Sequence, residues 1–207
     1  MQTSDSAMRN HNLGHWPPKG LVTMALVFTC LCIDQSLGNQ EPKIVDSPAD
    51  KQAVQLLERR VNDYVKHRNQ IKEKLPKLSK DSTPEQIQAF KTNFVEALRA
   101  ARQGAKRGDL FTPQVASYIE RTLREEFRGK DRMQLREIVF EAETEGVPMR
   151  VNYPYPASAE MAEMPPTLLL KLPQLPKELR YRFVGRNLIL VDRESSVIVD
   201  FITGALP

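Results

Sequence analysis

The chain has 207 residues, with 30 lysines and arginines against 26 aspartates and glutamates, and its formal net charge is +4. This basic excess is mild, and the basic runs lack the neighbouring aromatic residues that nucleic-acid binding uses, so we expect no nucleic-acid partner. Both cysteines lie before residue 39, and a single histidine, His67, lies after it. Residues 39–207 therefore hold no cysteine nucleophile and too few ligands for a structural zinc site.

Residues 1–38 are predicted to be a signal peptide. Residues 21–33 are uncharged and 13 in number, which suits the hydrophobic part of such a peptide and falls short of the roughly 20 residues that span a membrane. Arg9 and Lys19 precede this run, and a small-x-small pattern ending at Gly38 marks a cleavage site. We expect Sec-type export, which makes the protein periplasmic or secreted. The alternative is an uncleaved anchor in the inner membrane, which would be the chain's one contact with a membrane.

Four helices are predicted in residues 39–145, which we assign to one helical domain. The first three begin at Ser47, Thr83 and Thr112, each followed by a proline, and the fourth follows Asp131. Apolar residues then recur in alternating steps of three and four, as in helices with one buried face. The predicted stripes, the first of which skips Arg68, are Val54, Leu57, Val61, Tyr64, Ile71 and Leu75; Ile87, Phe90, Phe94, Leu98 and Ala101; Val115, Ile119, Leu123 and Phe127; and Leu135, Ile138, Val139 and Ala142. We expect an antiparallel helical array that provides the stable core.

The chain changes character at residues 146–178, where frequent prolines exclude long helices and central strands. We expect this proline-rich segment to connect the helices to a small sheet. Three strands are predicted in residues 179–207, around 179–183, 188–191 and 197–199, because short apolar runs alternate there with turns. The predicted fold is therefore mainly α with a small β appendage (α+β), in which a three-stranded antiparallel meander docks on the helices.

Both faces of the last two predicted strands are apolar, and the helices can cover only one of them. The other face needs the proline-rich segment, a partner protein or a second copy of the chain. The residues of this predicted interaction surface are Tyr153, Tyr155, Tyr181, Phe183, Leu188, Leu190, Val197 and Val199.

No catalytic constellation is recognisable. Asp192 and Asp200 are the carboxylates of the predicted strands, and paired carboxylates can perform acid–base chemistry or hold a hard cation. Structural roles are favoured because no other catalytic group accompanies them: Asp192 starts a turn, and Asp200 forms an ion pair with Arg182 or Arg186. His67 lies among charged residues and is expected to be solvated. We predict no catalytic residue, no metal site and no cofactor.

The C-terminal sequence is LPQLPKELRYRFVGRNLILVDRESSVIVDFI, with VNYPYP upstream. It resembles the end of a group of exported bacterial proteins of unassigned function and, more distantly, that of the periplasmic nickel/cobalt-homeostasis family. The resemblance covers about 30 residues and implies a periplasmic location. It does not imply nickel binding, because such a site favours a histidine-rich chain and His67 alone remains after cleavage.

Two classes of function follow. The first is a non-enzymatic envelope protein, a scaffold that binds another envelope protein or a second copy of itself through its C-terminal sheet. The alternative is a carboxylate-based hydrolase of the cell envelope. A hydrolase would show acids from distant segments converging in a deep pocket, whereas a binding protein would show an apolar patch or groove.

Overall fold

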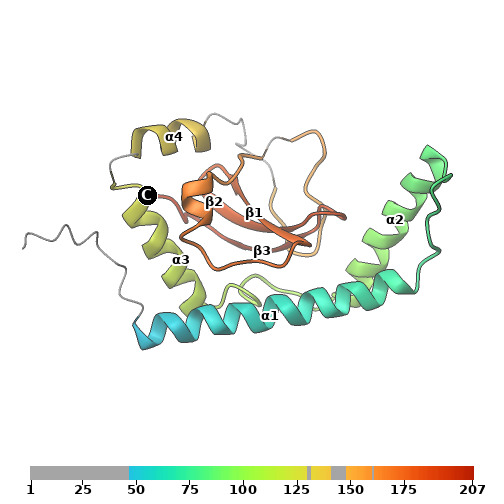
Figure 1. Ribbon diagram of the computed structural model, residues 1–207, viewed down its shortest axis with the longest axis horizontal. Helices are drawn as coiled ribbons and strands as arrows, with labels where there is room; N and C mark the ends of the chain where they lie inside the picture. The colour runs from blue at the N-terminus through green and yellow to red at the C-terminus, as the bar shows by residue number, and fades with distance from the viewer. Residues whose placement is uncertain (1–46, 130–131, 141–147, 160) are drawn as a thin grey trace, which may run out of the picture. The chain divides into compact units, whose positions relative to one another are not determined.

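Five helices and three strands make up the residues that the computed structural model describes, which are 47–129, 132–140, 148–159 and 161–207 (Figure 1). The helices are α1 (Pro48–Glu73), α2 (Pro84–Ala101), α3 (Pro113–Glu126), α4 (Arg132–Phe140) and α5 (Pro166–Leu169), and the strands are β1 (Leu179–Val184), β2 (Asn187–Asp192) and β3 (Ile198–Ile202). The predicted fold class is confirmed. The predicted signal peptide, Asp131 and Ala142 lie outside the described residues.

Capping interactions define the starts of the first three helices, as predicted. The Asp50 amide donates to Ser47 Oγ at 3.1 Å and the Ser47 amide donates to Asp50 Oδ2 at 3.3 Å, which makes a capping box at α1. Thr83 and Gln86 form the same box at α2. The Thr112 hydroxyl accepts a hydrogen bond at the start of α3. These starts depend on adjacent residues only, which is why the sequence predicts them.

The strands pair antiparallel in the order β1-β2-β3, as predicted for a meander. Val184 pairs with Asn187, so a two-residue turn joins β1 to β2. Gly185 in this turn has a φ of +54°, a conformation that glycine adopts at little cost. A bulge at Leu190 and Val191 shifts the register against β3.

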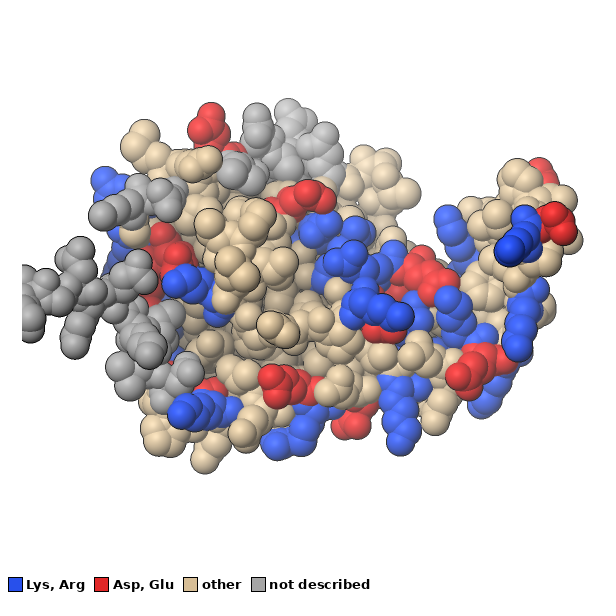
Figure 2. Space-filling view, in the orientation of Figure 1, with Lys and Arg blue, Asp and Glu red and all other residues tan. Residues whose placement is uncertain are grey.

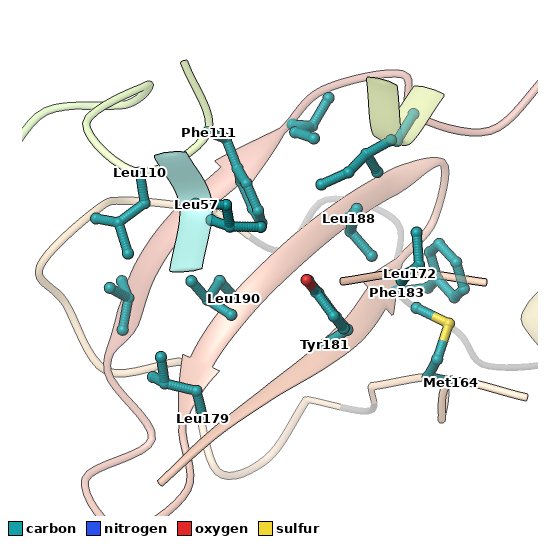
Figure 3. Packing of buried hydrophobic residues seen from close by; sticks show 14 of the residues in the cluster. Leu57, Leu110, Phe111, Met164, Leu172, Leu179, Tyr181, Phe183, Leu188 and Leu190 are labelled. Atoms are coloured by element: carbon teal, nitrogen blue, oxygen red, sulfur yellow. The ribbon is translucent and has the colours of Figure 1, made fainter. Parts of the chain in front are cut away.

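One face of the sheet packs against the helices in a shared hydrophobic core. Figure 3 shows Leu57 of α1 over the sheet face that carries Tyr181, Leu188 and Leu190. These four side chains are at most 1 % exposed. The expectation that the helices alone provide the core is therefore wrong, because the sheet supplies fully buried side chains to the same cluster.

Helix α2 buries only part of its apolar stripe. Phe94 and Leu98 are fully buried, Phe90 is half-buried, and Ile87 is 38 % exposed. Ala101, the last residue of the predicted stripe, is exposed. Only part of the predicted apolar face of α2 is therefore buried, and the sheet completes the hydrophobic core.

The proline-rich segment covers the second face of the sheet. Tyr155 packs there in a separate cluster with Val184, Ile189, Val191 and Ile198, against Met149, Ala159, Met161 and Phe201. The same segment also covers β3's outer edge, where the Ile198 amide donates to the Tyr153 carbonyl at 2.9 Å. The sequence analysis named the proline-rich segment, a partner protein and a second copy as possible covers for this face. In the structure the proline-rich segment covers it.

The predicted interaction surface is accordingly wrong for seven of its eight residues. Tyr155, Tyr181, Phe183, Leu188, Leu190, Val197 and Val199 are at most 3 % exposed. Only Tyr153 reaches the surface, where it is half-buried. An alternating apolar pattern predicts that the side chains are buried. It does not distinguish burial inside the protein from burial against a partner.

Candidate functional site

Asp192 is a structural carboxylate at the end of β2. It is fully buried, and its oxygens accept hydrogen bonds from Arg68 Nε at 2.8 Å and from the Tyr64 hydroxyl at 3.1 Å. The amides of Glu194 and Ser195 also donate to it, at 3.0 and 2.9 Å, so Asp192 starts a turn as expected. Burial and the neighbouring Asp192 carboxylate raise the pKa of Tyr64, which keeps this hydroxyl a donor.

Asp200 is a structural carboxylate on β3. Its oxygens accept hydrogen bonds from the amides of Gly108 at 2.9 Å and of Leu110 and Phe111 at 2.8 Å each. It also accepts from the Phe201 amide at 2.8 Å. Asp200 therefore holds the loop between α2 and α3 against the sheet, and its oxygens are occupied by this role.

The predicted ion pair of Asp200 with Arg182 or Arg186 is wrong. Asp200 stands opposite Leu190, which belongs to the helix-facing core, whereas Arg182 stands opposite Ile189, which belongs to the second cluster. Cross-strand partners share a face, so Arg182 and Asp200 lie on opposite faces of the sheet. Arg182 instead pairs with Glu163 at 3.0 Å, and Arg186 donates to the Leu206 carbonyl at 2.9 Å.

Arg68 is the buried partner that the sequence analysis missed. It occupies a stripe position of α1, is 4 % exposed, and forms ion pairs with Asp192 and Glu194 of the β2–β3 turn. Its guanidinium carbon also lies 5.0 Å from the centre of the Phe94 ring of α2. The sequence did indicate a buried ion pair here, because Arg68 is a charged residue at a position of the apolar stripe. Arg68 joins α1, α2 and the sheet.

Glu194 is expected to make folding sensitive to acid. Burial pushes the pKa of the Glu194 carboxyl upward, but hydrogen bonds and charges from Lys72 and Arg68 outweigh it and hold the pKa below its ordinary value. The resulting stabilisation is complete above the unfolded pKa of about 4.3 and is lost as the pH falls through the folded pKa. Glu194→Gln should therefore reduce the fall of Tm below about pH 4, measured by thermal denaturation across pH. The exposed Glu125→Gln is the control, and an unchanged pH profile in Glu194→Gln would contradict the prediction.

His67 is exposed on α1, as the sequence predicts. No group of three or more histidine, cysteine, aspartate or glutamate side chains within the described ranges is placed to hold a metal ion. The helices of those ranges are also too short or too polar to cross a bilayer.

Charges of both signs are interspersed on the face shown in Figure 2. Lys and Arg side chains along α1 and α2 alternate with Asp and Glu side chains there, so the basic residues of this face do not form an uninterrupted stripe. A broad uncharged area lies in the middle of the same face, where Figure 1 places α5. This area directs attention to the surface around α5.

A hollow of about 370 Å³ lies between α5 and β1, and we call it the α5–β1 groove. Its lining residues are Met164, Leu169, Leu170, Leu172, Gln174, Leu175, Pro176, Lys177, Leu179, Arg180, Tyr181, Arg182 and Arg193. Leu169 is 50 % exposed and Leu170 is 85 % exposed. A second hollow of about 370 Å³, which includes Val54 and Tyr118, begins on the other side of Leu170. Two neighbouring leucines therefore stand in solvent between two depressions.

The α5–β1 groove has four basic lining residues, Lys177, Arg180, Arg182 and Arg193, and no acidic one. Burial, together with the positive charges of Arg180 and Arg193, lowers the pKa of Arg182, although the Glu163 carboxylate opposes this effect. The Nε atom of Arg180 is buried and has no hydrogen-bond partner among the described residues. The cations of the groove thus repel one another and remain incompletely neutralised.

The outer edge of β1 lies beside this groove. The Phe183 amide and carbonyl both bond to Ala162 at 3.1 Å, so odd-numbered residues of β1 direct their backbone groups away from β2. The Tyr181 amide therefore also faces outward, and the Tyr181 carbonyl accepts from Arg182 Nη1 at 3.1 Å. Tyr181 is only 1 % exposed, so this amide is buried and the edge of β1 is not open to an added strand.

The two predicted carboxylates are thus occupied in structural bonds, and the described residues combine exposed leucines and cations at the α5–β1 groove. Of the residues that line this groove, only Tyr181 and Arg182 were site candidates from the sequence. In comparisons with protein-family models, with curated proteins and with solved structures, no match to this chain was found.

Proposed function

We propose that the chain is an exported, non-enzymatic protein of the bacterial envelope that binds an extended, acidic and apolar segment of another protein in the α5–β1 groove. The observation that carries the proposal is the composition of this groove. Its exposed leucines, Leu169 and Leu170, lie beside four basic lining residues, and no lining residue is acidic. Such a surface complements apolar side chains interspersed with carboxylates.

The engagement of Asp192 and Asp200 favours binding over hydrolysis. A carboxylate that acts as a general acid or base must reach the reacting atoms of a substrate. Both side chains are fully buried and accept several hydrogen bonds from the protein itself. The hydrolase alternative would therefore need other carboxylates than the pair that suggested it.

The proposed partner lies extended in the groove. Its apolar side chains contact Leu169 and Leu170. Alternate side chains of an extended segment point to the same side, so its carboxylates can reach Arg180, whereas Arg182 is already paired with Glu163. A second copy of the chain is disfavoured as the partner, because both faces of its sheet are covered.

The proposed export is supported by the predicted signal peptide and by the resemblance of the C-terminal sequence to exported bacterial proteins. The partner is accordingly a protein of the same compartment. Both cysteines lie in the predicted signal peptide, so after its removal the exported chain would have to be stable without disulfides. The buried ion pairs and carboxylate–amide bonds supply cross-connections between distant segments.

Selection from a library of displayed random peptides tests the proposed function. We expect peptides retained by the protein to be enriched in Asp or Glu alternating with Leu, Ile or Val, because the groove offers cations beside leucines. Enrichment of basic peptides, or the absence of any enrichment, would contradict the proposal. The affinity of an enriched, fluorescently labelled peptide is then measured by anisotropy.

Variants of groove residues, compared with the same replacements elsewhere, test whether the peptide binds in the α5–β1 groove. Leu170→Ser and Arg180→Gln should each weaken the peptide about tenfold or more, since each removes a central contact. Met133→Ser and Arg124→Gln change an exposed apolar residue and an exposed arginine of other helices, and they should leave the affinity unchanged. Equal losses in the two pairs would show that binding does not use the α5–β1 groove.

A further inference from the structure

A third hollow lies at the C-terminal end of α2 and shares no lining residue with the α5–β1 groove. We call it the Tyr153 pocket. It has a volume of about 440 Å³, and its lining residues are Glu96, Arg99, Ala100, Gln103, Ala105, Arg150, Val151, Asn152 and Tyr153. Helix α2 supplies one wall and the proline-rich segment the other, so residues far apart in the sequence meet here.

Asn152 fixes the position of the second wall. Its φ is +67°, a left-handed conformation that asparagine adopts more readily than most residues. Its backbone amide donates to the Ile198 carbonyl at 2.8 Å, which holds it to β3. Its side-chain amide donates to the carbonyls of Arg99 and Arg102 at 2.9 and 3.0 Å, at the C-terminal end of α2. The same two carbonyls also accept from the backbone amides of Arg102 and Ala105. Asn152 thus brings its neighbours Arg150 and Tyr153 up to Arg99.

Two guanidinium groups lie over the same tyrosine ring. The guanidinium carbon of Arg99 is 4.1 Å from the centre of the Tyr153 ring, and that of Arg150 is 3.9 Å from it. The ring attracts both cations, but their like charges repel each other.

No carboxylate among the described residues forms an ion pair with either arginine. Glu96 is the one acidic lining residue, and it lies beyond ion-pair distance from both. In addition, Arg99 Nε and Asn152 Oδ1 are buried without a hydrogen-bond partner. Buried polar atoms are nearly always paired in folded proteins, so an unpaired donor and an unpaired acceptor at one pocket require an explanation.

An oxyanion supplies what these groups lack. A phosphate or carboxylate group accepts charge-assisted hydrogen bonds from guanidinium groups, and arginine's planar fork fits either one. A hydroxyl on the same molecule could donate to Asn152 Oδ1. We propose that the Tyr153 pocket binds a small phosphate- or carboxylate-bearing molecule against Arg99 and Arg150, which both line it.

Calorimetric titration with inorganic phosphate and with citrate tests this proposal on the intact protein at low ionic strength. We expect at least one of the two anions to bind. Arg150→Gln should weaken that binding about tenfold or more, because a hydrogen bond between charged partners is lost. Arg150 is exposed, so its replacement should leave the fold intact, which circular dichroism can verify. The anion that binds more tightly identifies the oxyanion class.

Two control variants separate a site from general attraction to a basic protein. Arg124→Gln changes the net charge equally at an exposed position of α3 and should leave the affinity unchanged. Glu96→Gln removes the acid of the pocket and should strengthen binding. Failure of both anions to bind would overturn the proposal, and so would equal weakening by Arg150→Gln and Arg124→Gln.

Discussion

Removal of residues 179–207 is expected to abolish the cooperative unfolding transition of the protein. The deleted strands contain Tyr181, Leu188 and Leu190, which are buried in the same cluster as Leu57 of α1. The deletion also removes Asp192 and with it the buried partner of Arg68. Losing one such side chain costs about 2–5 kcal/mol, and a domain has only about 5–15 kcal/mol of stability to lose. Far-UV circular dichroism against temperature should show weak helicity and no sharp transition.

A matched replacement elsewhere tests whether the effect is specific. Residues 77–81, between α1 and α2, are all exposed, and exchanging them for glycine and serine should retain a cooperative transition. The amphipathic stripes alone predicted the opposite result for the truncation, namely helices that persist without the sheet. A truncated protein that melts cooperatively, with its helical signal intact, would contradict this expected result and favour a core made by the helices alone.

Replacement of Arg68 by methionine is expected to lower the free energy of unfolding by about 3–5 kcal/mol. The side chain of Asp192 is fully buried, so without Arg68 its charge remains in the interior without a cationic partner. Methionine fills similar space on α1, which limits the contribution of a cavity to the measured loss. Urea denaturation followed by circular dichroism measures the change.

Arg59→Met on the same helix is the control, because Arg59 is exposed. It should change the free energy of unfolding by no more than about 0.5 kcal/mol. The double variant Arg68→Met with Asp192→Asn should recover part of the loss, because it removes both charges while retaining an acceptor for the turn amides. A loss below about 1 kcal/mol in Arg68→Met would show that the ion pair does not stabilise the fold.

Helix starts and strand order could be predicted because their determinants are close together in the sequence. Ser47 and Asp50 are three residues apart, and the turn at Gly185 joins strands that are adjacent in the chain. Local patterns of this kind specify which elements form. They do not specify which elements meet, and the predicted helical core was wrong for that reason.

The buried polar contacts could not be predicted because they join distant segments. Arg68 and Asp192 are 124 positions apart, and Leu110 and Asp200 are 90 apart. The strand period does place Asp200 and Arg182 on opposite faces once the register is known, but the sequence alone leaves the register open. The α5–β1 groove escaped notice because exposed Leu170 and buried Leu172 stand in one leucine-rich run.

The long separations between bonded residues have a consequence for the order of events during synthesis. Helices α1 to α3 leave the ribosome well before the strands that hold Asp192 and Asp200, so their apolar faces lack the sheet at that stage. A topology dominated by such distant contacts folds slowly, because long loops must close before those contacts form. If the chain is exported as proposed, such a delay would keep it unfolded for translocation through a membrane channel. A circular permutant in which the three strands precede α1 in the chain should therefore fold sooner after synthesis.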